Sequence, residues 1–467
     1  MRLTAGEIAT ATDGEIIAGA LDEVAESFTL DSRTLETGGC FVALTAERDG
    51  HDFVPDAFAR GATVAIVGRG FRIGAGLESG TLVRVADPLT ALGALGALAR
   101  ERLAGATVVG ITGSAGKTAT KDLVAAATSG NRRVTASPVS FNNEAGLPLT
   151  LLAADAETEV VVAEMGARFA GNIADLCAIA RPGVGVITNV GLAHAGLLGG
   201  RAGVAAVKGE LLEALPDDGV AILDATDEHT PALARRSAAR VLKVGLGAEI
   251  AAAVRATDVV LDEQLRPSFQ LVTPAGSVTV RLSVRGEHQV LNAAMAAAVA
   301  LEVGVPLNEI AAGLGQAESA PWRMELVQTP RGVAVLNDAY NASPTSTTAA
   351  LRALARLPVT GRRMAVLGEM RELGAEADAA HSDMGRIAVE CGVDVMVVVG
   401  REARAVGAGA RAAARGSVEV VEVPDAAAAL DAVARRVEPG DAVLVKASRA
   451  VGLERVAEAL ADEAVSA

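Results

Sequence analysis

The stretch GITGSAGKTATKD, residues 110–122, decides the fold of this chain. An apolar run at residues 106–110 precedes it, and an alanine-rich helical pattern at residues 121–128 follows it. A strand, a glycine turn, a Lys-Thr pair and a helix, in that order, are typical of a phosphate-binding loop. We therefore expect a protein that consumes or senses a nucleoside triphosphate.

Each residue type in this stretch has its own part in holding phosphate. Gly113 and Gly116 let the backbone curl so that consecutive N–H groups face a polyphosphate. Lys117 would reach the β- and γ-phosphates, and Thr118 would offer its hydroxyl to Mg²⁺. The stretch departs from the strict pattern at Ile111, where a glycine is usual. The alternative interpretation is a glycine-rich turn with a chance Lys-Thr pair.

Size and charge narrow the class of protein. With 467 residues the chain is too long for one hydrophobic core, and about three domains of roughly 150 residues are expected. Half of the residues are apolar, which favours a globular protein over a disordered one. The net charge of −15 argues against general binding to nucleic acid or to anionic membranes. It does not exclude a phosphorylated substrate, which a local loop can hold.

The cysteines and the N-terminus favour a cytoplasmic protein. Cys40, Cys177 and Cys391 lie far apart and form no CxxC pair, so neither a disulfide framework nor a zinc site is expected. Residues 1–16 lack an apolar segment, so we expect no signal peptide. The longest apolar stretch, near residues 293–301, is too short to span a bilayer, and we expect no membrane insertion.

Apolar runs that alternate with helical patterns divide the chain into three α/β segments. Residues 1–98 are predicted to form a small α/β domain. Residues 99–319 favour a doubly wound, mostly parallel sheet that holds the phosphate loop, with an alternating strand at 277–284 that favours antiparallel pairing. Residues 320–467 favour a second, Rossmann-like α/β domain. The other expected strands are residues 40–44, 62–67, 81–85, 107–111, 160–163, 184–188, 220–223, 333–336, 364–367, 395–399 and 442–445.

Polar side chains near the phosphate loop are candidates for the site. Glu164 ends an apolar strand, where it could hold Mg²⁺ or cap the next helix. His194 follows another strand end and could bind a metal, although a lone histidine near glycine is more often structural. Lys208 lies on a predicted helix, where a surface lysine is the ordinary interpretation. Asn142 and Asn143 could bind a ligand through their amides or merely form a turn.

The last segment has candidates of its own around Trp322 and Tyr340, the only Trp and the only Tyr of the chain. Asp338 follows a strand and could accept hydrogen bonds from ribose hydroxyls, while Arg323 could neutralise phosphate. In so aromatic-poor a chain, this clustering suggests a site.

Many of these segments together resemble the Mur ligase family over essentially the whole chain. Their order and spacing carry the resemblance, since any single segment would be unspecific. The segments are DSRTLETGGCFVALTAERDGHDF (31–53), GITGSAGKT (110–118), SFNNEAGLPLTLL (140–152), VVAEMGA (161–167), TNVGLAH (188–194), AVKGELL (206–212), GEHQVLNA (286–293), WRMELV (322–327), NDAYNASPTS (337–346), LGEMRELG (367–374) and VLVKASR (443–449).

The resemblance implies a three-domain ligase that closes around ATP and uses Mg²⁺, as two ions. In this family a substrate carboxylate attacks the γ-phosphate to form an acyl phosphate, and an incoming amine then attacks that carbonyl as phosphate leaves. The ATP phosphates would lie on Gly113, Ser114, Ala115, Gly116, Lys117, Thr118 and Ala119.

The same match implies the metal-binding and catalytic positions. Thr118, Glu164, His194 and Lys208 fall on the metal-binding positions, and Lys117, His194 and Lys208 on the catalytic ones. Lys208 matches the family's carbamylated lysine. A carbamate would turn that cation into an anion able to bridge to Mg²⁺.

The substrate positions are spread over all three segments. The resemblance places adenine on Asn292, phosphate on Arg323 and ribose on Asp338. The uridine-nucleotide and dipeptide substrates would contact Ser32, Arg33, Asn142, Asn143, Lys446 and Ser448.

Three residues depart from the family pattern. Gln289 stands where an Asn is usual, Gly196 lacks the acidic residue of many relatives, and Ala447 replaces a Gly. The departure at Gln289 leaves the adenine contact open, and that at Gly196 leaves the metal ligands open. The departure at Ala447 leaves open how the backbone lies on the dipeptide side.

The stretch DAYNASP, residues 338–344, favours the family member that adds D-alanyl-D-alanine to UDP-N-acetylmuramoyl-tripeptide in peptidoglycan synthesis. We expect it to work as a monomer. A sibling that adds lysine or diaminopimelate is the main alternative. A nucleotide switch without ligase chemistry, or a small-molecule P-loop kinase, belongs to a different class, and the DSR and HDF segments argue against the switch.

Overall fold

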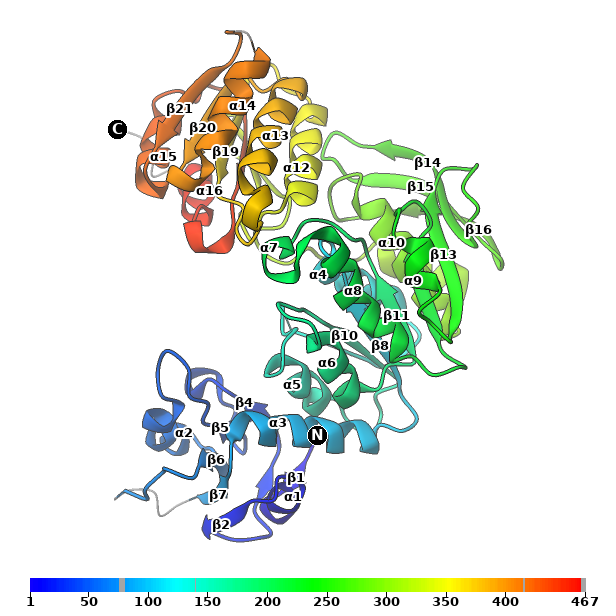
Figure 1. Cartoon of the computed structure of the whole chain (residues 1–467), viewed down its shortest axis with the longest axis vertical. Coiled ribbons are helices and arrows are strands. Elements are labelled where there is room, and N and C mark those ends of the chain that lie inside the picture. The colour runs from blue at the N-terminus through cyan, green and yellow to red at the C-terminus, as the bar shows by residue number, and fades with distance from the viewer. Residues whose placement is uncertain (75–79, 139, 415, 463–467) are drawn as a thin grey trace.

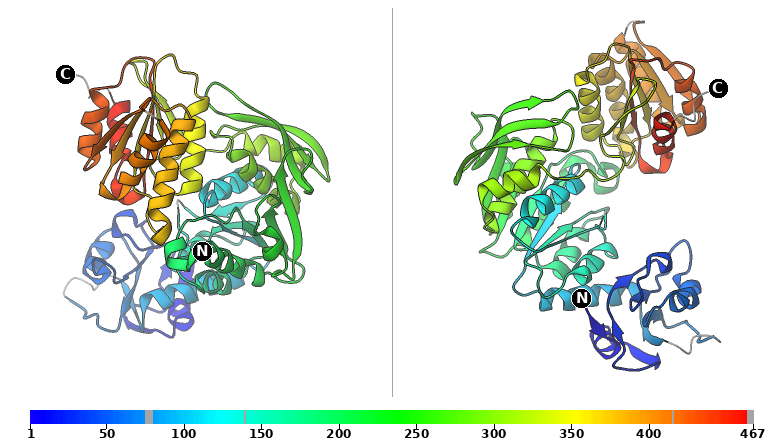
Figure 2. Two further views of the ribbon diagram at one scale, coloured as in Figure 1. Left: turned by 45° about the horizontal axis from the view of Figure 1, so that its top comes forward. Right: turned by 180° about the vertical axis from the view of Figure 1, so that it is seen from behind.

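The chain folds into three α/β units that follow one another along its length. The computed structural model describes residues 1–74, 80–138, 140–414 and 416–462. Figure 1 shows the N-terminal unit in blue at one end, the C-terminal unit in orange and red at the other, and the central unit between them. The view from behind in Figure 2 shows the same order. The expected three-part α/β architecture is confirmed.

A nine-stranded sheet, counted over the described residues, forms the middle of the central unit. Its strands are β8 (Thr107–Thr112), β9 (Val134–Ala136), β10 (Val160–Glu164), β11 (Val184–Ile187), β12 (Val220–Asp224), β13 (Arg240–Leu246), β14 (Val254–Leu261), β15 (Pro267–Thr273) and β16 (Gly276–Arg281). They lie in the order β16-β15-β14-β13-β12-β11-β8-β10-β9, and all pairs from β9 to β14 are parallel. The chain leaves β8 towards β9 and β10 and then crosses to β11, so β8 is the switch point where α/β sheets bind ligands.

Helices cover both faces of this sheet. They are α3 (Pro88–Arg102), α4 (Lys117–Ser129), α5 (Gly146–Ala153), α6 (Asn172–Ala180), α7 (Ala195–Leu198), α8 (Gly200–Glu213), α9 (Thr230–Ala234), α10 (Gln289–Glu302) and α11 (Leu307–Leu314). Helices α3, α5, α6 and α8 pack on one face, and α4, α10 and α11 on the other. Every residue of α10 from Asn292 to Ala300 is buried, because its alanines let neighbouring elements approach closely. Among the described helices, none has the length and apolar character that a bilayer crossing requires.

The N-terminal unit is built on a five-stranded sheet in the order β2-β7-β6-β5-β4. Its elements are β1 (Leu3–Thr4), α1 (Ala5–Ala11), β2 (Glu15–Ala18), β3 (Val24–Ala25), β4 (Phe28–Thr29), β5 (Cys40–Val42), α2 (Val54–Ala59), β6 (Val64–Gly68) and β7 (Thr81–Val85). Helix α3 leads out of it, capped by Asp87, whose carboxylate accepts from the Thr90 N–H at 2.8 Å. The domain limit predicted at residue 98 falls inside this helix.

The C-terminal unit carries a six-stranded sheet in the order β17-β18-β22-β19-β20-β21. Its elements are β17 (Glu325–Gln328), β18 (Ala334–Asn337), α12 (Pro344–Arg356), β19 (Arg363–Gly368), η3 (Gly374–Glu376), α13 (Ala377–Glu390), β20 (Val395–Val399), α14 (Arg404–Ala414), β21 (Glu419–Val423), α15 (Ala426–Ala434), β22 (Ala442–Lys446) and α16 (Glu454–Ala461). All strands except β17 are parallel. Because β22 pairs with β18, the ends of these two strands lie side by side.

The expected strands are present within a few residues, and the antiparallel strand predicted at 277–284 is β16, paired with β15. Among the described strands, the sequence analysis missed β1, β2, β3, β4, β9, β13, β14, β15, β17 and β21. In β14 and β15 buried residues alternate with partly exposed or exposed ones, so neither strand forms a continuous apolar run.

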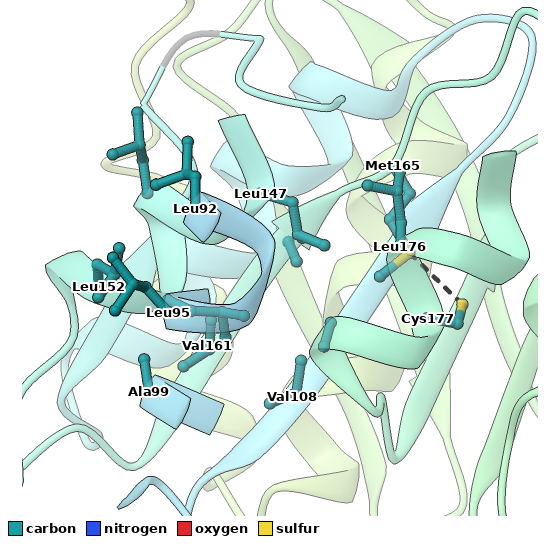
Figure 3. Close-up of a cluster of buried hydrophobic side chains, with 14 of the residues drawn as sticks. Leu92, Leu95, Ala99, Val108, Leu147, Leu152, Val161, Met165, Leu176 and Cys177 are labelled. Carbon is teal, nitrogen blue, oxygen red and sulfur yellow. Dashed lines mark hydrogen bonds between the residues drawn. The ribbon is translucent and has the colours of Figure 1, made fainter. Parts of the chain in front are cut away.

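Helix α3 joins the first two units through the apolar cluster drawn in Figure 3. Leu92, Leu95 and Ala99 of α3 face Leu147 and Val161, which belong to α5 and β10. Their spacing of three and four residues places them on one face of the helix.

We expect Leu95→Ala to lower the free energy of unfolding by about 2–5 kcal/mol, because Leu95 is fully buried and its loss leaves a cavity. Chemical denaturation followed by circular dichroism measures this. Leu21, which is 68% exposed, provides the control, and Leu21→Ala should change stability by less than about 0.5 kcal/mol. Equal losses in both variants would contradict the role of α3 as core.

Candidate functional site

The phosphate loop adopts the curled backbone that its glycines predict. Gly113 has a φ of +152° and Gly116 a φ of +81°. A Cβ on Gly113 would lie 1.8 Å from Thr188 Oγ1, so only glycine fits there. Asn189 accepts from the Ala115 N–H at 3.0 Å and donates to the Ala115 carbonyl at 2.9 Å. The loop is therefore held in shape by the residues that follow β11.

Lys117 begins helix α4 and folds back over the loop. Its Nζ donates to the Gly113 carbonyl at 2.8 Å. Burial lowers the pKa of Lys117, while Glu164 raises it and Arg323 lowers it further. A lysine held against the carbonyl of a phosphate loop is in place to exchange that contact for a phosphate oxygen.

Thr118 and Glu164 meet at the edge of the sheet. The pairing of β10 with β8 sets Glu164 opposite Ile111, and the Thr118 hydroxyl donates to Glu164 Oε2 at 2.7 Å. Asn142 Nδ2 donates to the other carboxylate oxygen, Oε1, at 2.7 Å. Helix α6, the next helix, has Gly171 at its N-cap with no side-chain cap, so Glu164, which is only 1% exposed, does not cap it.

Arg323 reaches this point from the C-terminal unit. Its Nη2 donates to Thr118 Oγ1 at 3.1 Å, and its guanidinium carbon lies 4.0 Å from the centre of the Tyr340 ring. The Tyr340 hydroxyl in turn donates to Ser140 Oγ at 2.8 Å. Of the two aromatic residues that the sequence indicated, Tyr340 therefore contacts the central unit, whereas the Trp322 indole bonds to Glu458 within the C-terminal unit.

Lys208 is not the surface lysine that its sequence context suggests, and that interpretation is wrong. It lies on the buried face of α8 and is only 3% exposed. Burial lowers the pKa of Lys208 well below its usual value, and the charge of Lys117 lowers it further. Within the described part of the chain, its ammonium makes no hydrogen bond or ion pair.

His194 lies at the start of α7 with a φ of +62°, unusual for a residue with a side chain. Its Nδ1 pairs with a carboxylate oxygen of Glu372 from the C-terminal unit. Burial lowers the pKa of His194, and Glu372 opposes that effect. Glu372 is a site residue that the sequence analysis missed. The sequence analysis used its segment, LGEMRELG, only as one of the segments that resemble the family. No local pattern in that segment predicts that Glu372 faces His194.

Asp338 and Lys446 bind each other at the ends of β18 and β22. Lys446 Nζ lies 2.5 Å from Asp338 Oδ2, and Asp338 Oδ1 accepts from the Met324 N–H at 3.1 Å. Ser448 Oγ accepts from the Arg371 N–H at 3.0 Å. Both oxygens of the predicted ribose acceptor therefore have partners within the C-terminal unit.

Asn292 Nδ2 donates to Gln289 Oε1 at 2.9 Å. The Asn292 side chain also lies against the phosphate loop: a Cβ placed on Gly116 would be 2.8 Å from Asn292 Oδ1. Asn143 Oδ1 accepts from the Gly146 N–H at 2.9 Å, at the start of α5. This contact is the turn role that the sequence left open for Asn143.

The two candidates of the N-terminal unit stand apart from this group. Ser32 Oγ donates to Asp56 at 2.7 Å, and Arg33 pairs with Asp31 at 2.6 Å with its side chain 81% exposed. Neither bonds to a residue of the other two units among the described contacts.

The structure thus gathers one set of predicted residues at the end of β8, and their roles stay predictions. Across the described residues, no three His, Cys, Asp or Glu side chains cluster as a metal cage. One carboxylate and one hydroxyl beside a phosphate loop suit Mg²⁺, which usually takes few protein ligands together with substrate phosphates. The set comprises Lys117, Thr118, Asn142, Glu164, His194, Lys208 and Arg323.

A phosphate loop at the switch point of a doubly wound sheet, completed by an arginine from a second α/β unit, defines a class of nucleotide-dependent enzymes. Residues 111–300 match the Mur ligase middle domain, and residues 322–449 match the glutamate ligase domain of the Mur ligases. The chain belongs to the Mur ligase family.

Individual relatives match most or nearly all of the chain. A UDP-N-acetylmuramoyl-tripeptide–D-alanyl-D-alanine ligase from Mycobacterium tuberculosis is 41% identical, covering 97% of this chain and 98% of its own. The ligase of the same name from Escherichia coli is 37% identical over 86% and 87%. The crystal structure of MurF from Acinetobacter baumannii superposes with a TM-score of 0.86 at 33% identity, covering 98% and 99%. MurF from Thermotoga maritima, solved with ADP, gives a TM-score of 0.76 at 30% identity over 92% and 96%.

We expect Lys117→Ala to reduce ATP turnover by at least about 10²-fold, because it removes a charge that stabilises the transferring phosphoryl group. Phosphate release measures this, and thermal unfolding should stay near that of the unaltered chain. Lys243→Ala, at an exposed lysine, is the matched control. Turnover retained in Lys117→Ala would show that the phosphate loop is wrongly assigned.

Proposed function

We propose that this chain joins D-alanyl-D-alanine to UDP-N-acetylmuramoyl-tripeptide, driven by ATP, through an acyl phosphate. The observation that carries the proposal is the bond from Arg323 to Thr118 Oγ1 at 3.1 Å, by which the C-terminal unit completes the phosphate site of the central unit. A two-unit site suits a reaction in which two substrates meet at one nucleotide. The relatives named above carry this activity in their names.

ATP is the nucleotide of this ligase. In the proposed first step, Lys117 and Arg323 neutralise charge on the γ-phosphoryl group while the tripeptide carboxylate attacks it; the bond to the β-phosphate oxygen breaks and ADP is released. The phosphates would lie along Gly113 to Ala119, against the backbone N–H groups at the start of α4. In the second step the amine of the dipeptide attacks the acyl carbonyl, and phosphate leaves. Asn292 is assigned to adenine and Asp338 to ribose, as the family pattern implies.

The residues present fit Mg²⁺. Thr118 and Glu164 would hold it, with His194 and a carbamylated Lys208 at a second position. Bound Mg²⁺ supplies charge neutralisation for phosphoryl transfer. Lys117 lies near both Arg323 and Lys208: Arg323 lowers the pKa of Lys117, and Lys117 lowers the pKa of Lys208, so an added anion is favourable here.

The surroundings of Lys208 also suit carbamylation. Its amine is buried, its pKa is lowered well below the usual value, and no described acceptor holds its proton. A neutral amine is the form that adds to CO₂. The resulting carbamate would face Lys117, which now repels the ammonium.

The two substrates are proposed to enter from opposite sides. Ser32 and Arg33 of the N-terminal unit, with Asn142 and Asn143, would bind the uridine-nucleotide substrate. Lys446 and Ser448 would lie on the dipeptide side. We further propose a monomer that acts in the cytoplasm, with no nucleic-acid partner and no membrane insertion. The three free cysteines and the acidic charge support that setting.

Phosphate release separates this function from its alternatives. ATP, Mg²⁺ and UDP-N-acetylmuramoyl-tripeptide are supplied with and without D-alanyl-D-alanine, and the product is weighed by mass spectrometry. Phosphate release that requires both the tripeptide and D-alanyl-D-alanine, together with a pentapeptide product, supports the proposal. Release with the dipeptide precursor and free lysine or diaminopimelate would transfer the function to the sibling ligase. Slow release without either substrate would indicate a nucleotide switch.

Lys208→Ala should lower ligation at least about 10²-fold and recover part of it in millimolar acetate or formate, because a small carboxylate can replace the carbamate. NMR with ¹³C-bicarbonate gives an independent readout, since the carbamate signal should be present in the unaltered chain and absent from the variant. Lys243→Ala is again the control. Full activity in Lys208→Ala would exclude a carbamate role.

A further inference from the structure

A single loop of the central unit, residues 188–198, supports the phosphate loop at one end; we call it the bridging loop. Asn189 holds the Ala115 backbone through two hydrogen bonds. The Gly191 N–H donates to Ser114 Oγ at 2.8 Å. Whatever displaces the bridging loop therefore displaces the backbone that faces the phosphates.

At its other end, the bridging loop enters the C-terminal unit. Leu192 packs against an apolar cluster made of Ala342, Met370, Leu373, Ala380 and Met384. Two residues later, His194 Nδ1 pairs with Glu372, and the Gly196 N–H donates to the Glu372 carbonyl at 3.1 Å. Figure 1 shows α7, which contains Gly196, against the C-terminal unit.

The backbones of the two units touch directly at two glycines. A Cβ on Gly196 would lie 2.5 Å from Gly374 N and 2.7 Å from Gly374 Cα. Gly196 lies in α7 and has no positive φ, so its own unit would accept alanine. Only the C-terminal unit forbids a side chain there.

Glu372 projects from a segment that the C-terminal unit holds firmly, residues 369–376, here called the docking loop. Buried His381 donates from Nδ1 to the Ala377 carbonyl at 2.7 Å and accepts the Met370 N–H on Nε2 at 2.8 Å. Ser448 Oγ accepts from the Arg371 N–H. Glu372 itself has a φ of +64°, a strained conformation that persists only when its surroundings impose it.

We propose that Glu372 is a positioning residue of the ligase: it binds His194 across the interface and, with the Gly196–Gly374 contact, seats the C-terminal unit on the bridging loop. His194 and the phosphate loop reach their working geometry only when the C-terminal unit is docked. The catalytic consequence rests on the proposed function, whereas the docking consequence does not.

Amide hydrogen exchange of the full chain without substrates tests docking by itself. Gly196→Ala and Glu372→Gln should each speed exchange in the bridging and docking loops by at least about fivefold, because both loosen the contact. Gly105→Ala, with no atom near its Cβ, and Glu376→Gln, an exposed carboxylate of the same loop, are the matched controls and should not. Unchanged exchange in both test variants overturns the proposal.

Steady-state kinetics tests the consequence for the reaction. Glu372→Gln and Gly196→Ala should lower kcat by about 10²-fold, because displacing catalytic groups by about 1 Å has an effect of that size. The KM for ATP should stay within about twofold of that of the unaltered chain. A raised KM with unchanged kcat would make Glu372 a nucleotide-binding residue, and an equal loss in Glu376→Gln would make the effect nonspecific; either overturns the positioning role. If the unaltered chain forms no pentapeptide, the proposed function fails, and hydrogen exchange still decides the docking.

Discussion

The parallel pairing of β8 with β10 is the constraint on which the site depends. Glu164 pairs in register with Ile111, two residues before the phosphate loop curls at Gly113. Parallel strands end at the same edge of a sheet, so the loop and the carboxylate arrive at one point. The Thr118 hydroxyl then lies 2.7 Å from Glu164. Every other site residue is placed relative to this pair.

The positive charges gathered at this site favour the binding of anions. Lys117 lies near both Lys208 and Arg323, and burial lowers the pKa of both lysines. Like charges at such distances repel strongly where water is excluded. Triphosphate and a carbamate would each relieve that repulsion. The same charges that stabilise a transferring phosphoryl group thus favour the binding of the groups that the reaction needs.

The C-terminal unit takes part in the site through two separated contacts. Arg323 and Tyr340 bond to residues around the phosphate loop, while Glu372 bonds to His194. The N-terminal unit contributes none of these contacts in the described residues, and α3 ties it to the face of the central sheet that α5, α6 and α8 also cover. Closing of the units around substrates would therefore bring Ser32 and Arg33 towards a site that the other two units already form.

Local sequence by itself determined the phosphate loop, the parallel sheet and the candidate residues that follow its strands, because glycine spacing and apolar runs act over a few neighbouring positions. It missed β14 and β15, whose burial alternates. Only the tertiary structure decided that Lys208 is buried and that Glu372 meets His194, 178 positions away. Such contacts depend on how helices and whole units pack, and no local pattern encodes which side chain a distant loop will present.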